Sequence, residues 1–182
     1  MSESFQKNDI DWLKSINSSN FEHKALDLFH WQANNIPVYR YLLRVRNLDP
    51  LSVQSISDIP FLPIEAFKNH IVAPANVRLK DYFESSGTSG QTRSKHYVLD
   101  SSIYDYTSIN GFEKKWGALK NWTILALLPS YLERKNASLV YMVNKWIDES
   151  RKDESGFYLD QLGELSEQLN SLQRNGKKTL LI

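Results

Sequence analysis

The chain contains no cysteine, and this absence excludes several kinds of site. Without a thiol, its 182 residues can form no disulfide, no thiolate metal site and no cysteine nucleophile. A chain of this composition fits a reducing compartment.

Strong charge and long apolar stretches are also missing. The net charge is only +1, and the cations form short pairs that we interpret as solvated faces: Lys114–Lys115, Arg151–Lys152 and Lys177–Lys178. We therefore expect no nucleic-acid partner. The N-terminus, MSESFQKNDIDW, lacks the pattern of a signal peptide, and no apolar run is long enough to span a bilayer. These features predict a cytoplasmic protein with no membrane span.

What is present is the composition of a globular chain, 41% hydrophobic and 24% charged. Residues 1–78 are predicted to be a helical N-terminal region, and residues 79–182 an α/β portion. The predicted fold class is α/β, with a mixed or parallel sheet flanked by helices. The predicted helices cover residues 21–33, 38–45, 64–70, 137–147 and 159–172, and a further helix follows a cap at Ser101–Ser102 and extends to Leu119. The predicted strands cover residues 81–83, 97–99, 122–128 and 179–182.

The last predicted strand carries the apolar sequence TLLI at the end of the chain. Native termini are usually polar and exposed. We therefore expect a sequence truncated at its C-terminus, or a partner chain that covers this apolar end. The alternative is a genuine C-terminal strand at the centre of the sheet.

Between the strands predicted at 81–83 and 97–99 lies ESSGTSGQTRSK, which combines hydroxyls, two glycines and two cations. Glycine allows backbone N–H groups to converge on an anion, and hydroxyls add donors. Arg93 and Lys95 follow the glycines and can neutralise phosphate charge. Gln91 stands where a Walker A loop requires lysine, so the tract is not of that type. A flexible linker is the alternative, but the flanking strands favour a loop of fixed shape.

This tract, SSGTSG followed by a cation, resembles the phosphate loop of the adenylate-forming superfamily. The segments FLPIEAFK (61–68) upstream and LPSYLER (128–134) downstream are similar to the acyl-protein synthetase (LuxE-type) branch of that superfamily. The resemblance covers most of the chain from about Leu62 onward. It implies that the chain is the N-terminal part of an adenylate-forming enzyme's large domain.

The resemblance also implies an activity, that of an acid–thiol ligase. Such enzymes use ATP and Mg²⁺ to convert a carboxylic acid, here a fatty acid, to an acyl-adenylate, and then transfer the acyl group to a thiol. The thiol would lie outside this chain, on a protein cysteine or on coenzyme A. The implied ATP phosphate ligands are Ser85, Ser86, Gly87, Thr88, Ser89, Gly90, Arg93 and Lys95. Many members carry lysine where Arg93 stands, so either Arg93 or Lys95 would act as the loop cation.

The segment after the predicted strand 122–128 is the second candidate site. Ligands bind at the carboxyl ends of strands in open α/β sheets. By resemblance, this segment would contribute to the acyl pocket through Pro129, Ser130, Tyr131 and Arg134. The equivalent superfamily segment often carries a histidine, which is absent here. A surface turn is the alternative reading of its charged end.

Two other functions stay open on the sequence alone. One is a non-catalytic module that keeps the fold and binds a nucleotide or a partner. The other is a different phosphate-binding enzyme, although no acidic motif supplies its Mg²⁺ ligands. The histidines, His23, His30, His70 and His96, lack metal-site spacing, so no metal site is predicted.

Overall fold

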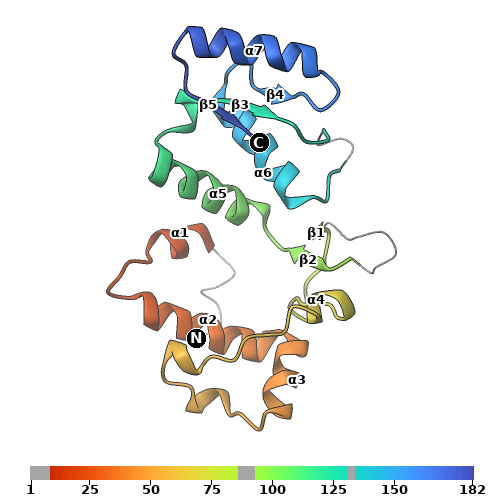
Figure 1. The fold of residues 1–182 in the computed structure, drawn as a ribbon. Helices are drawn as coiled ribbons and strands as arrows, with labels where there is room; N and C mark the ends of the chain where they lie inside the picture. The colour runs from red at the N-terminus through yellow and green to blue at the C-terminus, as the bar shows by residue number, and fades with distance from the viewer. Residues whose placement is uncertain (1–8, 86–92, 131–133) are drawn as a thin grey trace. The chain divides into compact units, whose positions relative to one another are not determined.

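The computed structural model describes residues 9–85, 93–130 and 134–182, and Figure 1 shows their elements. The protein is a mixed α/β chain with small sheets. Its contacts divide it into two compact units, residues 1–99 and 100–182, which are described separately. The boundary inferred after residue 78 from the change in sequence character stays a prediction.

The described part of the first unit is helical up to the hairpin that ends it. Its elements are α1 (Asp9–Lys14), α2 (Phe21–Asn35), α3 (Pro37–Val45), the 3-10 turns η1 (Pro50–Ser52) and η2 (Ile56–Asp58), α4 (Ala66–Asn69), β1 (Asp81–Glu84) and β2 (Lys95–Val98). The predicted helices are confirmed, although α4 is shorter than the predicted 64–70.

The core of this unit forms between α2 and α3. Pro37 occupies the first turn of α3, where its missing N–H has no helical partner to lose. Phe29 and Tyr39 are buried edge to face, with ring centroids 6.0 Å apart. The Tyr39 hydroxyl donates a 2.6 Å hydrogen bond to the Pro60 carbonyl, and burial raises the pKa of this phenol. The segment before α4 is thereby fastened to the helices.

The second unit is a three-stranded parallel sheet covered by helices. Its elements are α5 (Ser101–Trp116), η3 (Leu119–Asn121), β3 (Thr123–Ala126), α6 (Ser138–Ser150), β4 (Gly156–Phe157), α7 (Leu162–Arg174) and β5 (Thr179–Leu181). The strand order is β4-β3-β5, and both pairings are parallel. The predicted parallel sheet with flanking helices is confirmed for this unit, while the short strand β4 was not predicted.

Strand β3 is buried on both faces, as its continuous apolar sequence predicts. Ile124 and Ala126 pack in one cluster with Phe112 of α5 and Val143 of α6. Leu125 points to the other face and packs with Leu165 and Leu172 of α7. The layers are therefore α5 and α6, then the sheet, then α7.

Two details of this unit differ from the sequence prediction. Leu119 does not continue α5, because Gly117 ends that helix with a φ of 85°, and Leu119 is buried in η3 instead. The cap of α5 is Asp100 and not the predicted Ser101–Ser102, because the Asp100 carboxylate accepts the Ser102 N–H at 2.9 Å.

We expect Leu125→Ala to lower the free energy of unfolding by about 2–5 kcal/mol, because its side chain is fully buried. Leu181→Ala is the matched control. Leu181 pairs with Leu125 in register but is 47% exposed, so this substitution should lower the free energy of unfolding much less. Urea unfolding followed by tryptophan fluorescence measures both. Equal losses would contradict the two-layer burial of β3.

We also expect a pH-dependent contribution from the Asp100 cap. Hydrogen bonds from the Ser102 side chain and backbone lower the pKa of Asp100, so its stabilisation is present above the unfolded pKa of about 3.9 and is lost as pH falls through the folded value. Asp100→Ala should lower the free energy of unfolding at pH 7 by about 0.5–1 kcal/mol, the low end for an exposed cap. Urea unfolding near pH 3 should show a smaller difference between the two proteins. Asp100→Asn, which keeps an acceptor without the charge, should retain its cap at both pH values.

Candidate functional site

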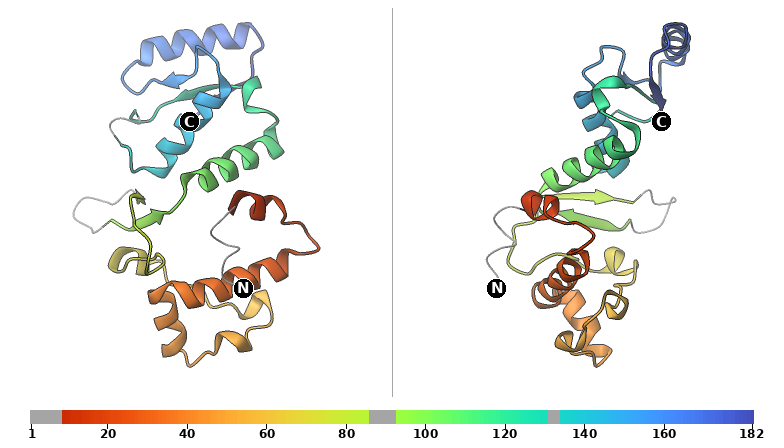
Figure 2. Two further views of the ribbon diagram at one scale, coloured as in Figure 1. Left: turned by 180° about the vertical axis from the view of Figure 1, so that it is seen from behind. Right: turned by 90° about the vertical axis from the view of Figure 1, so that its left-hand side faces the viewer.

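The candidate phosphate loop is carried by the antiparallel hairpin of β1 and β2, whose strands lie side by side in both views of Figure 2. The register pairs Glu84 with Lys95 at the end of the hairpin next to the loop. Beyond it, the Ser85 N–H donates to the Ser94 carbonyl and the Ser94 N–H donates to the Ser85 hydroxyl, each at 3.1 Å. Ser85 and Ser94 therefore close the base of the loop.

Both candidate cations lie on the returning arm of the loop. The Arg93 guanidinium is 3.4 Å from the Glu84 carboxylate, in a pair that is partly exposed. The Lys95 ammonium lies over the Tyr82 ring, 4.6 Å from its centroid. Arg93 therefore forms an ion pair with a carboxylate, whereas Lys95 contacts an aromatic ring.

The hairpin is supported by the segment that precedes it. Phe67 of α4 and His96 of β2 stack with ring centroids 5.7 Å apart and an interplanar angle of 6°. This contact links the FLPIEAFK segment to the strand that leaves the loop. It also gives His96 a packing role, as expected for an ordinary strand histidine.

The other predicted loop ligands lie outside the described residues. These are Ser86, Gly87, Thr88, Ser89 and Gly90. The described part of the site consists of its base, Ser85 with Ser94, and the two cations.

The candidate acyl segment begins where β3 ends. Pro129 and Ser130 are half-buried and follow the carboxyl end of β3, the edge at which open α/β sheets bind ligands. The Arg134 N–H donates to the Ser130 carbonyl at 3.2 Å, and Arg134 is exposed. Tyr131 lies outside the described residues. The predicted position of this segment, directly after an apolar strand, agrees with its place after β3. Its role in a pocket for an acyl chain stays a prediction.

One polar cluster of the second unit was not anticipated from the sequence. The Lys145 ammonium of α6 lies 3.3 Å from the Asp105 carboxylate of α5. Burial disfavours the charged lysine, but Asp105, together with Tyr141 and Asp148, outweighs this effect, so the pKa of Lys145 is raised. A charged residue at a helical position gives no sign of its partner on another helix. The pair joins α5 to α6, and we assign it a structural role.

Among the residues that the structure describes, no histidine, aspartate and glutamate side chains gather in a group of three or more that could hold a metal ion. The described helices include none with the length and apolar character needed to cross a bilayer. No protein-family model, curated protein sequence or solved structure matches this chain.

We expect Ser85→Ala to loosen the base of the loop, because the Ser94 N–H loses its hydroxyl acceptor. One hydrogen bond contributes about 1 kcal/mol, so the Ser94 amide should exchange about five- to tenfold faster in deuterated water, measured by NMR. Ser94→Ala is the control, because it keeps the backbone N–H and carbonyl of residue 94. Similar exchange rates in the wild type and Ser85→Ala would contradict the closed base.

Proposed function

We propose that this chain is the phosphate-binding N-terminal portion of an ATP-dependent acid–thiol ligase of the acyl-protein synthetase type. The observation that supports the proposal best is the hairpin that closes the Ser/Gly/Thr tract at Ser85 and Ser94. A linker has no reason to be closed at its base by two strands in register, whereas an anion-binding loop needs such a rigid frame.

In the proposed reaction, a carboxylate oxygen of a fatty acid attacks the α-phosphorus of ATP, and pyrophosphate leaves. A thiol then attacks the carbonyl carbon of the acyl-adenylate, and AMP leaves. The attack brings two anions together, so it depends on positioning and on charge neutralisation. The proposal assigns these tasks at the β- and γ-phosphates to the loop and its cations. The acceptor thiol comes from a protein cysteine or coenzyme A, because this chain has no cysteine.

The charges at the loop base fit a triphosphate. Partly exposed ion pairs such as Arg93–Glu84 contribute only about 0–1 kcal/mol, so a phosphate can displace the carboxylate. The Lys95 ammonium lies over the Tyr82 ring. Mg²⁺ would enter with the phosphates of ATP and keep several water ligands, as this ion usually does.

The proposal predicts effects of opposite sign at the ion pair. Glu84→Gln removes the carboxylate that competes for Arg93, so Mg-ATP should bind about two- to fivefold more tightly, equivalent to up to about 1 kcal/mol. Arg93→Gln and Lys95→Gln should each weaken Mg-ATP binding, and the larger loss identifies the cation that acts at the loop. Isothermal titration calorimetry of the 182-residue chain measures all three.

AMP and a remote variant are the controls. Wild-type protein should bind Mg-ATP more tightly than AMP, because AMP lacks the β- and γ-phosphates. Lys114→Gln, in the exposed last turn of α5, should bind Mg-ATP as the wild type does. Equal affinities for ATP and AMP, or the same sign for Glu84→Gln and Arg93→Gln, would overturn the assignment of the loop.

Pyrophosphate exchange tests whether this chain alone can form the acyl-adenylate. With ATP, a fatty acid and radiolabelled pyrophosphate, we expect binding without exchange by this chain alone, because the resemblance assigns adenine and ribose contacts and a catalytic lysine to later segments of such enzymes. Exchange by this chain alone would contradict that division of roles and would exclude the non-catalytic alternative.

A further inference from the structure

The second unit contains a hollow at the amino-terminal edge of its sheet, opposite to the edge from which Pro129 and Ser130 emerge. The hollow has a volume of about 490 Å³, within the range of small-molecule sites. Segments distant in sequence converge on it: Asn121 and Thr123 at the start of β3, Lys152 and Glu154 between α6 and β4, and Lys177 and Lys178 before β5.

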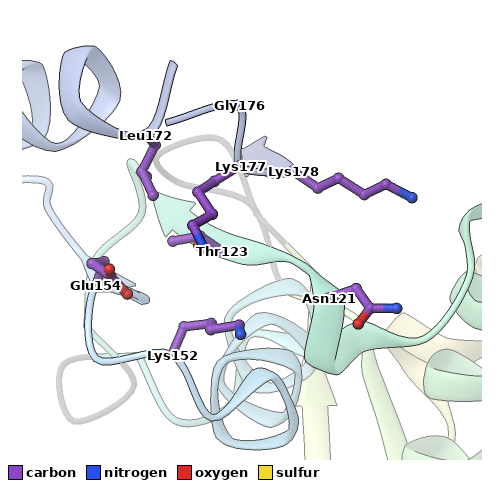
Figure 3. A pocket seen from close by; sticks show the side chains of 8 residues that line it. All are labelled: Asn121, Thr123, Lys152, Glu154, Leu172, Gly176, Lys177 and Lys178. Atoms are coloured by element: carbon purple, nitrogen blue, oxygen red, sulfur yellow. The ribbon is translucent and has the colours of Figure 1, made fainter. Parts of the chain in front are cut away.

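Three lysines and one glutamate line this hollow, in a protein whose total net charge is +1. Figure 3 shows Lys177 and Lys152 entering from opposite sides, with Glu154 and Asn121 on the two remaining sides. Lys178 turns away from the centre, and its ammonium lies 5.6 Å from the centroid of the Trp122 ring. Lys152 and Lys177 therefore concentrate positive charge on one small volume.

These lysines form no ion pair within the described part of the chain. No described carboxylate lies within ion-pair distance of the ammonium groups of Lys152, Lys177 or Lys178, whereas Lys145 and Arg93 each have such a partner. Like charges that line one hollow repel each other, and this cost is removed when an anion enters between them.

The backbone around the hollow is firmly held, so the lysines project from a fixed frame. The Thr123 N–H donates to the Lys178 carbonyl at 2.9 Å, and the Lys177 N–H donates to the Leu172 carbonyl at 3.0 Å. Gly176 makes the turn between α7 and β5 with a φ of 60°, a conformation that favours glycine. On the other side, the Ser155 hydroxyl accepts the Ile124 N–H at 3.0 Å and holds the Lys152–Glu154 loop to β3.

We propose that this hollow binds a small, multiply charged anion of the phosphate or diphosphate class, with Lys152 and Lys177 as its charge-bearing ligands. The asparagine amide of Asn121 supplies a neutral donor, and Glu154 disfavours large polyanions that would contact the whole rim. The site uses residues of the second unit only, so it is distinct from the phosphate loop and does not depend on the function proposed for that loop.

The test is a titration of the isotope-labelled 182-residue chain with sodium pyrophosphate, followed by NMR at fixed ionic strength. We expect saturable shifts of the Thr123, Gly176 and Lys177 amides. The double variant Lys152→Gln/Lys177→Gln should weaken this binding at least about tenfold, because both charged ligands are lost while their aliphatic stems are kept. Inorganic phosphate should bind the same amides more weakly than pyrophosphate.

A charge-matched variant separates a site from general attraction. Lys114→Gln/Lys115→Gln removes two charges from the exposed end of α5 and should leave the titration of Gly176 and Lys177 unchanged. Lys95→Gln, at the phosphate loop, should also leave the titration of Gly176 and Lys177 unchanged. The experiment therefore tests the hollow separately from the assignment of the loop. Non-saturable shifts, or equal losses in the two double variants, would overturn the proposal.

Discussion

Complete burial of β3 is the constraint on which the second unit depends. All four of its residues are buried, with Ile124 and Ala126 against α5 and α6 and Leu125 against α7. A strand in that position must pair on both edges, which β4 and β5 do in parallel. Parallel pairing in turn requires the crossovers that contain α6 and α7. The burial and pairing of β3 therefore determine where the loops at its two ends lie.

The two ends of β3 therefore have different chemistry. Pro129 and Ser130 follow its carboxyl end, where α/β sheets usually bind ligands. At its amino end, the loops before β4 and β5 bring Lys152 and Lys177 to the same hollow. In the first unit the equivalent frame is the β1–β2 hairpin, which fixes the positions at which Ser85 leaves and Ser94 returns.

Much of this fold could be predicted from sequence because the signals are local. The apolar run from Trp122 to Leu128 indicates a doubly buried strand, and Pro37 marks the start of a helix. Strand β4 could not be predicted, because Gly156–Phe157 is only two residues long and is defined by pairing with β3. The same holds for the candidate phosphate loop. Its motif could be recognised in the sequence, whereas the contact of Arg93 with Glu84 depends on strand register and could not be predicted.

The lysine pairs show why local reasoning fails for electrostatics. Arg151–Lys152 and Lys177–Lys178 each resemble an ordinary solvated face, and a net charge of +1 indicates no nucleic-acid partner. Charges interact over a Debye length of about 8 Å at physiological salt, so their distribution within such a volume matters more than their sum. Folding brings Lys152 and Lys177 to one hollow although 24 residues separate them along the chain. A low net charge argues against an extended basic surface for nucleic acid, but it leaves room for local anion sites made by tertiary contacts.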